Sequence, residues 1–240
     1  MHPRAGKDER DVMPRCRICL KPLEGQYTFV QWLLQEEELC NECLMRLRPE
    51  PRHLHLDDLP LTAYYRYDEF MESLLFQFKE GRDVALAPVF FSQVMKQMKR
   101  RYRRWQWVLM PSSDERRMTR GFSPLRRMLA DSGMMLYEPF YKTDDHKQSS
   151  MDRIHRTQIS TVIRLKEEYP LPSGRVVLID DVCTTGATLK HAYHLLKEHT
   201  IKVEAVTCCA HPLLFETMAQ PLRHFAGRRG KDGRHGKMVQ

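Results

Sequence analysis

The sequence predicts an α/β protein with a mostly parallel sheet and a small cysteine-rich module near the N-terminus. Three observations predict this architecture. Apolar segments typical of strands alternate with segments of helical periodicity, as in folds built from strand–helix–strand units. Residues 176–179 form a continuous apolar run, which is typical of a strand buried on both faces. Two Cys-x-x-Cys pairs stand about 20 residues apart in the first part of the chain.

Composition limits the classes of protein that fit. Hydrophobic residues make up 42% of the 240 residues, which is enough to build a core, so a wholly disordered chain is excluded. No apolar run approaches the roughly 20 residues that a membrane helix needs, and the charged first residues lack the apolar stretch of a signal peptide. We therefore expect a cytoplasmic protein without membrane insertion. The formal net charge of +8 favours an anionic partner, which charge alone does not identify.

The four N-terminal cysteines have the spacing of a structural zinc site. Each Cys-x-x-Cys turn places two thiolates on one side of a tetrahedron, and two such turns close it without an open position. Two redox motifs or unpaired thiols are the alternative. Two of the other three cysteines, Cys208 and Cys209, lie in an apolar segment and are expected to pack in the core. The predicted zinc ligands are Cys16, Cys19, Cys40 and Cys43.

The chain divides into four predicted parts. These are a zinc module over residues 1–50, a proline-rich linker over 51–60, the α/β domain over 61–222 and a basic, disordered tail over 223–240. Within the domain, periodicity and turn residues predict helices at 70–81, 84–103 and 188–199 and a further helix that begins at Ser123. Strands are predicted at 105–110, 134–141, 176–179 and 203–209. A polar loop is predicted at 112–121 and a longer, mobile one at 142–158.

Two adjacent acids and a threonine-rich loop follow the strand at 176–179. Ligands bind at the carboxyl ends of parallel strands, and a helix N-terminus offers free N–H groups to a phosphate. The carboxylates of Asp180 and Asp181 accept hydrogen bonds only, so they suit sugar hydroxyls or a hydrated Mg²⁺ ion. The pattern predicts a site for a phosphorylated sugar, and a simple helix-capping turn is the alternative. The loop adds hydroxyl donors and a glycine that allows close approach, at Thr184, Thr185, Thr188 and Gly186.

A basic run interleaved with aromatic residues predicts a second binding surface. A groove of cations with stacking aromatics is how single-stranded nucleic acid is held without sequence preference. The alternative is that Trp105 and Trp107 belong to the strand core and that the cations are an exposed helix end. The candidate nucleic-acid contacts are Arg100, Arg101, Arg103 and Arg104.

The acid pair and the loop resemble the binding loop for 5-phosphoribosyl 1-diphosphate (PRPP) in type I phosphoribosyltransferases. The resemblance implies that Asp180 and Asp181 are the catalytic acids, which bind the ribose hydroxyls, and that Mg²⁺ accompanies PRPP. It also implies that Arg116, Arg117 and Arg120, in the 112–121 loop, neutralise the departing diphosphate. The loop that would hold the 5′-phosphate comprises Cys183, Thr184, Thr185, Gly186, Ala187 and Thr188.

Together with the four-cysteine module, these motifs make the chain similar to the ComF family. Further matching stretches are 74–83, Met110-Pro111 and the segment at 120–123, so the resemblance covers nearly all of the chain from Cys16 to His211. It implies a competence protein that takes part in DNA uptake during natural transformation, with single-stranded DNA and a helicase-like protein as partners. An active transferase that acts on an unidentified nucleobase or amine is the alternative. Ser123 stands where the family usually has asparagine, which weakens the prediction of transferase turnover.

Overall fold

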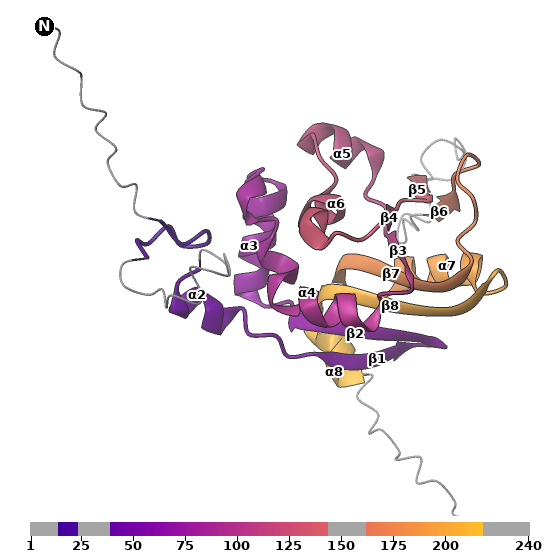
Figure 1. Ribbon diagram of the computed structural model, residues 1–240, viewed down its shortest axis with the longest axis horizontal. Helices are drawn as coiled ribbons and strands as arrows, with labels where there is room; N and C mark the ends of the chain where they lie inside the picture. The colour runs from indigo at the N-terminus through magenta and orange to yellow at the C-terminus, as the bar shows by residue number, and fades with distance from the viewer. Residues whose placement is uncertain (1–13, 24–38, 144–161, 218–240) are drawn as a thin grey trace, which may run out of the picture.

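The computed structural model describes residues 14–23, 39–143 and 162–217 (Figure 1). Two predicted features lie outside these residues. They are most of the long loop at 142–158 and the basic tail at 223–240.

A six-stranded sheet in the order β1-β2-β8-β7-β3-β4 forms the centre of the fold. All neighbouring strands are parallel except the edge strand β1, which runs antiparallel to β2. The prediction of an α/β fold with a mostly parallel sheet is therefore confirmed. The strands are β1 Arg52–Leu56, β2 Leu59–Arg66, β3 Gln106–Leu109, β4 Leu136–Tyr137, β7 Gly174–Cys183 and β8 Thr200–Ala210.

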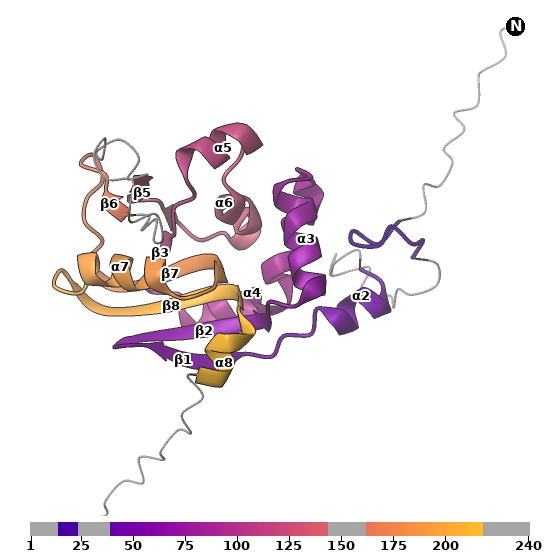
Figure 2. The same cartoon turned by 180° about the vertical axis from the view of Figure 1, so that it is seen from behind.

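The two central strands, β7 and β8, are covered on both faces. The side chains at 176–179 in β7 are fully buried, as the continuous apolar run predicts. Helix α4 (Val89–Arg101) lies over one face of the sheet and helix α7 (Ala187–Leu196) over the other, as the front and back views show (Figures 1 and 2). Each helix buries an apolar stripe, so the core is continuous across the sheet.

Helix α3 (Glu69–Lys79) ends in a lysine whose charged side chain lies at the candidate functional site. Its N-cap is Asp68, whose carboxylate accepts a hydrogen bond from the Met71 N–H at 2.9 Å.

The antiparallel hairpin of β5 (Phe140–Thr143) and β6 (Val162–Leu165) forms a separate two-stranded sheet. The remaining helices are α2 Asn41–Arg46, α5 Asp114–Arg120, α6 Pro124–Met128, α8 Pro212–Thr217 and the 3₁₀ turns η1 Val84–Leu86 and η2 Ala130–Ser132.

The predicted linker at 51–60 is wrong, because these residues form β1 and the beginning of β2. Asp57 lies in the turn between the two strands, with a φ of 56°. The prolines and charges of this segment resemble a linker, but every apolar residue in it faces the core. Those residues are Leu54, Leu56 and Leu59, followed in β2 by Leu61, and each is at most 4% exposed.

Three further predicted elements have different bounds. The helix expected at 84–103 is interrupted, because Pro88 separates η1 from α4. The strand expected at 134–141 is divided between β4 and β5, which pair in different sheets on either side of Pro139. The loop expected at 112–121 contains helix α5, which is short, buries no residue and therefore lacks the apolar periodicity of a core helix.

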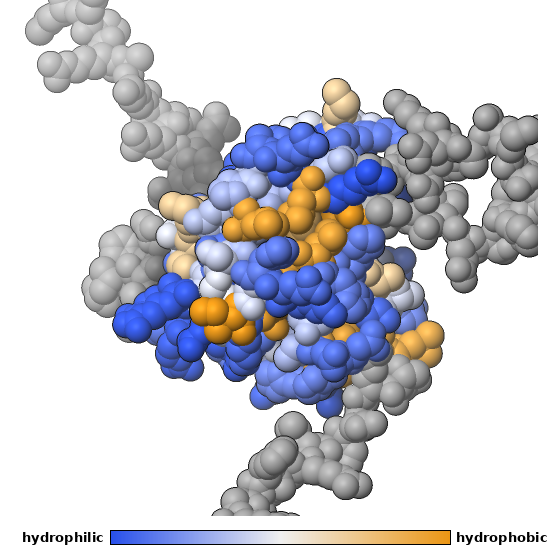
Figure 3. Space-filling model, turned by 90° about the vertical axis from the view of Figure 1, so that its right-hand side faces the viewer, coloured by the Kyte–Doolittle hydropathy of each residue, from blue (hydrophilic) through white to orange (hydrophobic). Residues whose placement is uncertain are grey.

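The described surface is predominantly polar. Figure 3 shows a largely hydrophilic face, with an apolar cluster near its centre and smaller apolar groups toward the lower left and the lower right. Within residues 14–23, 39–143 and 162–217, every helix is too short or too polar to cross a membrane.

Candidate functional site

The four predicted zinc ligands lie together. The Sγ atoms of the four cysteines all lie within 4.8 Å of one another, and those of Cys19 and Cys40 are 3.6 Å apart. Zinc–sulfur bonds of about 2.3 Å in a tetrahedron require sulfur atoms about 3.8 Å apart, so the cluster has the size of a zinc site. Burial acts to raise the pKa of Cys16, but the backbone N–H groups around it lower that pKa to about 7, which favours the thiolate a metal needs.

The cysteine module packs against helix α3 and the turn after it. The Arg46 guanidinium of α2 lies 3.9 Å from the centre of the Phe70 ring in the first turn of α3. Arg17, between the first two cysteines, donates a hydrogen bond to the Ala85 carbonyl at 3.2 Å. The buried residues of the module belong to the same apolar cluster as the core of the sheet. The module is therefore continuous with the rest of the described fold.

The acid pair lies within strand β7, rather than after it as predicted. β7 continues to Cys183, because Asp180 pairs with Thr207 of β8 and Cys183 pairs with Ala210. On its other side, β7 loses its partner at Ile179, whose carbonyl accepts a hydrogen bond from the Met110 N–H at 2.9 Å. Since neighbouring side chains of a strand point to opposite faces, the two carboxylates meet different surroundings.

Asp181 is held by a lysine that sequence reasoning missed. Its Oδ2 lies 2.6 Å from Nζ of Lys79, the last residue of α3, and both side chains are less than one-fifth exposed. Burial alone would lower the pKa of Lys79, but the carboxylates of Asp181 and Asp180 raise it above its usual value, so the lysine is charged. The contact between Lys79 and Asp181 joins segments about a hundred residues apart, so no local sequence pattern predicts it.

Asp180 has the most perturbed carboxyl group of the site. Burial and the neighbouring charge of Asp181 raise its pKa from 3.8 to about 7, although Lys142 of β5 and Lys79 act in the opposite direction. Its Oδ1 also accepts a hydrogen bond from the Asp181 N–H at 2.9 Å. A carboxyl group that ionises near neutral pH beside a second carboxylate is typical of a binding or catalytic position.

The phosphate loop has the geometry that the motif predicts. Gly186 is the N-cap of α7 with a φ of 76° and has no side chain to cap the helix. The Ala187 N–H donates a 3.4 Å hydrogen bond to the Thr185 hydroxyl, and the other N–H groups of the first turn are available to a ligand or water. The hydroxyl-bearing residues Thr184 and Thr185 are exposed and Thr188 is half-buried. The loop brings backbone donors and hydroxyls to the same edge of the sheet as the acid pair.

The β1–β2 hairpin supports this loop from the side. A Cβ atom on Gly186 would come within 2.6 Å of the Leu56 side chain, so the glycine allows both the turn and the contact. In addition, the Asp57 carboxylate lies 3.4 Å from Nζ of Lys190, in the second turn of α7. The segment expected as a linker therefore packs directly against the candidate binding loop.

A cavity of about 490 Å³ opens after the end of β3, and its lining does not include Asp180 or Asp181. It begins at Met110, the residue hydrogen-bonded to β7 just before Asp180, and extends between α5 and the β5–β6 hairpin. Its volume is within the range of small-molecule sites. Acidic side chains outnumber basic ones in its lining, which includes Asp114, Glu138, Glu167 and Glu168 against Arg117 and Lys166.

The three arginines predicted to face a diphosphate have different positions. Arg117 lines the cavity and lies 3.4 Å from Asp114. Arg120 is almost fully buried and forms an ion pair with Glu80, while its Nε has no hydrogen-bond partner among the described residues. Arg116 lies close enough to lower the pKa of Glu80, after the larger effect of Arg120. Arg120 thus forms a salt bridge and is not among the residues that line the cavity.

In the basic run at the end of α4, the arginines are exposed, whereas two of the aromatic rings are buried. Trp107 is fully buried and Tyr102 is buried beside it, while Trp105 packs edge-on against Tyr102 at 5.3 Å. Tyr102 and Trp107 therefore belong to the core, and Trp105 lies at its margin. Trp105 is half-buried, so base stacking at this position stays a prediction.

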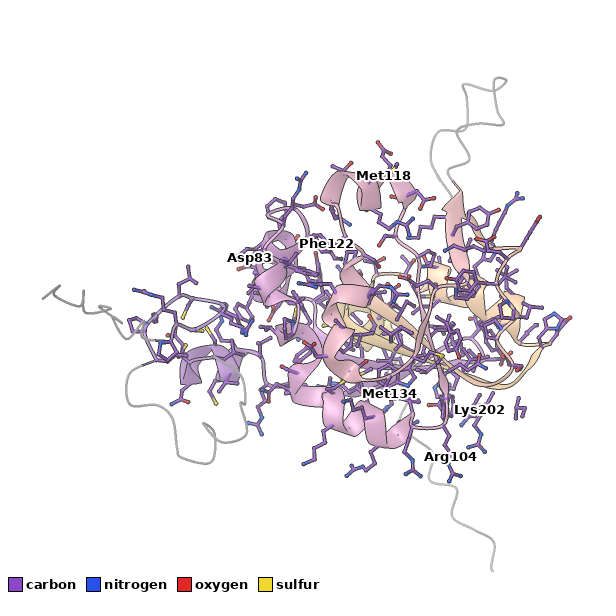
Figure 4. All side chains as sticks on the ribbon, turned by 45° about the horizontal axis from the view of Figure 1, so that its top comes forward. Asp83, Arg104, Met118, Phe122, Met134 and Lys202 are labelled. Atoms are coloured by element: carbon purple, nitrogen blue, oxygen red, sulfur yellow. The ribbon has the colours of Figure 1, made fainter. Side chains whose placement is uncertain are left out.

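The four predicted arginines of this run are exposed, but one of them, Arg101, pairs with an acidic residue of the sheet. Arg101 forms a 2.8 Å ion pair with the buried Glu204 and donates a hydrogen bond to the Tyr102 hydroxyl. Lys202 adds a cation beside Arg104 on the same side of the molecule (Figure 4), and its ammonium lies over the Trp105 ring. Arg100, Arg103 and Arg104 remain for an outside partner.

Comparison with known proteins finds one matching domain model and two similar competence proteins. A model described as "Phosphoribosyl transferase domain" matches residues 140–214, which include the acid pair and the phosphate loop. The chain is 29% identical over 136 residues to competence protein ComFC of Streptococcus pneumoniae, which covers 57% of this chain and 61% of that protein. It is 28% identical over 196 residues to competence protein ComFC of Bacillus subtilis, covering 80% of each. The match to the pneumococcal protein thus spans less than two thirds of its length.

Solved structures with similar arrangements include two hypoxanthine phosphoribosyltransferases. The enzyme from Trypanosoma cruzi, solved as a mutant in a ternary complex with its substrates, has 14% identity and a TM-score of 0.35, covering 53% of this chain and 78% of that chain. The enzyme from Staphylococcus aureus has 17% identity and a TM-score of 0.35, covering 53% of this chain and 64% of that chain. The fold class rests on the sheet topology and the domain match, since both TM-scores are below 0.5.

Proposed function

We propose that this ComFC-like protein, with its phosphoribosyltransferase-type fold and its N-terminal four-cysteine cluster, binds PRPP together with Mg²⁺. The observation that carries the proposal is the acid pair near the carboxyl end of a central strand, followed after a short threonine-containing loop by a helix N-terminus whose N-cap is a glycine. The site would belong to a cytoplasmic protein that takes part in competence and in the handling of incoming DNA.

Each part of PRPP has a matching group in this arrangement. The carboxylates of Asp180 and Asp181 accept hydrogen bonds from the two ribose hydroxyls, and the loop from Cys183 to Thr188 binds the 5′-phosphate through N–H and hydroxyl donors. The diphosphate end extends toward the cavity beside β3, where Arg117 is the cation in place.

Magnesium fits the chemistry of these residues. A hydrated Mg²⁺ prefers oxygen ligands and keeps several waters, and carboxylates predominate both in the acid pair and in the cavity lining. Without a cation, these carboxylates would repel a diphosphate. When bound, the ion would supply charge neutralisation between the acidic lining and the diphosphate.

Calorimetric titration of PRPP with Mg²⁺ tests the proposal. We expect one site per chain in the wild type and an affinity at least about a hundredfold weaker in the double variant D180N/D181N, because two charge-assisted hydrogen bonds weaken. Omission of Mg²⁺ should weaken binding in the wild type. Equal affinity in the wild type and the double variant would refute the assignment of the acid pair.

Transfer of the phosphoribosyl group to a nucleobase or amine is the alternative function. The cavity after the end of β3 is the observation that favours it, since an enzyme needs space for more than the sugar. Release of diphosphate in the presence of a panel of bases and amines distinguishes an enzyme from a PRPP-binding protein.

Contact with single-stranded DNA is a second candidate role, together with a helicase-like partner. The exposed Arg100, Arg103 and Arg104 support it, because each is free to approach a phosphate within the described part of the chain. Because Tyr102 and Trp107 are buried, we expect contact mainly with the phosphate backbone and little dependence on base sequence.

The salt dependence of DNA binding tests this role. For a single strand, each phosphate contact contributes about −0.7 to the slope of log K against log salt concentration, so R103Q/R104Q should reduce the magnitude of the slope by about 1.4. Arg66→Gln, an exposed arginine at the opposite, carboxyl end of the sheet in β2, is the matched control and should leave the slope unchanged. If the wild type fails to bind at low salt, the chain has no such role.

A further inference from the structure

Lys79 is the cation nearest to the acid pair, and its position is fixed by contacts on both sides of it in the sequence. Phe78 packs between Phe90 and Phe122, with ring centres 5.2 and 5.3 Å apart. Glu80 forms its ion pair with Arg120. These contacts fasten the last turn of α3 to α4 and to the turn between α5 and α6.

The residues that follow α3 make further contacts that hold its C-terminal end in place. Arg82 donates a hydrogen bond to the Thr119 carbonyl at 2.7 Å, and the Asp83 carboxylate accepts one from the Gln77 side chain at 3.0 Å. Figure 4 shows Asp83 and Phe122 close together where α3 meets the α5–α6 turn. The backbone that carries Lys79 is thus held by neighbours that have no contact with Asp181 themselves.

The contact between Lys79 and Asp181 restricts what the carboxylate can do. Nζ of Lys79 engages Oδ2 at 2.6 Å, so this oxygen is committed and the carboxylate is held in one orientation. The other oxygen, Oδ1, is left to accept a hydrogen bond from a ligand. Because both side chains are largely buried, breaking the contact would leave a poorly solvated charge, and the pair persists for that reason.

We propose that Lys79 is a positioning residue that makes the acid pair selective for a ribose carrying both of its hydroxyl groups. The proposal rests on the function proposed above. Lys79 orients Asp181 so that each carboxylate of the pair accepts one hydroxyl, and a sugar that lacks one hydroxyl then leaves a carboxylate without its donor. The lysine itself touches Asp181 and need not touch the sugar.

Two sugar phosphates that differ in one hydroxyl test the proposal. Ribose 5-phosphate and 2-deoxyribose 5-phosphate both retain the 5-phosphate, so contact with the loop is common to both. We expect the wild type to bind ribose 5-phosphate about tenfold or more tightly than the deoxy compound, the effect of one charge-assisted hydrogen bond. In Lys79→Met this preference should fall below about threefold, while affinity for the deoxy compound changes little.

Further variants separate positioning from a general structural effect. Lys79→Arg keeps a cation beside Asp181 and should retain most of the preference, whereas Lys197→Met, an exposed lysine after α7, should behave as the wild type. Lys79→Gln provides a second uncharged variant if Lys79→Met does not fold. A structural defect would weaken both sugar phosphates alike.

The outcomes distinguish this proposal from the proposed function. An unchanged preference in the folded uncharged variants overturns the role of Lys79 and leaves PRPP binding standing. If the wild type binds neither sugar phosphate nor PRPP, the proposed function fails, and the role of Lys79 fails with it.

Discussion

Replacement of Cys16 by serine is expected to abolish zinc binding and to unfold the cysteine module. Cys16 is fully buried, and its sulfur belongs to a cluster in which four Sγ atoms lie within 4.8 Å. The hydroxyl of serine is a poor zinc ligand, and structural zinc supplies apparent binding free energies of roughly 10–16 kcal/mol in small modules. The described part of the module buries few apolar side chains besides its cysteines, so it has little else to hold it together.

Zinc content by mass spectrometry and amide hydrogen exchange measure this effect. We expect one zinc per chain in the wild type and none in Cys16→Ser, with faster exchange in residues 14–23 and 39–47. The increase should extend into the first turn of α3, where Phe70 loses the Arg46 contact, but not into β7 or β8. Cys208→Ala, a buried cysteine of β8, should retain the metal. A Cys16→Ser protein that still holds one equivalent of zinc would contradict the assignment.

Replacement of Asp180 by asparagine is expected to stabilise the protein at pH 8 while weakening the candidate ligand site. The folded state raises the pKa of this carboxyl group from 3.8 to about 7, so it holds the proton more tightly than the unfolded chain does. Stability therefore falls as pH rises from about 4 to about 7, by up to about 4 kcal/mol, and less where solvent reaches the group. Asparagine removes the charge and retains the acceptor for the Asp181 N–H.

Urea unfolding at two pH values measures the gain. At pH 8 we expect Asp180→Asn to be about 2 kcal/mol more stable than the wild type, and near pH 5 the difference should shrink toward zero. The neighbouring change Asp181→Asn should have the opposite sign at pH 8, because it leaves the largely buried Lys79 without its carboxylate partner. If both isosteric variants destabilised the protein equally, the two carboxylates would not differ in environment as described.

The features predicted correctly from sequence are those that short segments encode completely. The zinc cluster depends on two local turns, and the phosphate loop depends on a strand, a glycine and a helix start that are consecutive in the chain. Buried parallel strands are likewise recognisable, because the run at 176–179 is apolar at every position. These features require no knowledge of how distant segments meet.

The features that were missed depend on distant contacts or on weak local signals. Lys79 reaches Asp181, and Arg101 reaches Glu204, across about a hundred residues in each case. The β1–β2 hairpin did have a local signal, since Leu54 and Leu56 alternate with polar residues before the Asp57-Asp58 turn. Helix α5 also had one, in the acids of its first turn and the arginines of its last.

The hairpin has a consequence for any attempt to divide the chain into an independent module and domain. A cut at residue 61 would remove β1, expose the backbone of β2 as a new sheet edge, and leave that edge open to pairing with other chains. It would also remove Leu56 from Gly186 and Asp57 from Lys190, so the ligand loop would lose its lateral support. The natural place of separation is therefore earlier than the composition of the sequence indicates, and a shortened chain that begins at β2 should aggregate where one that begins before β1 stays in solution.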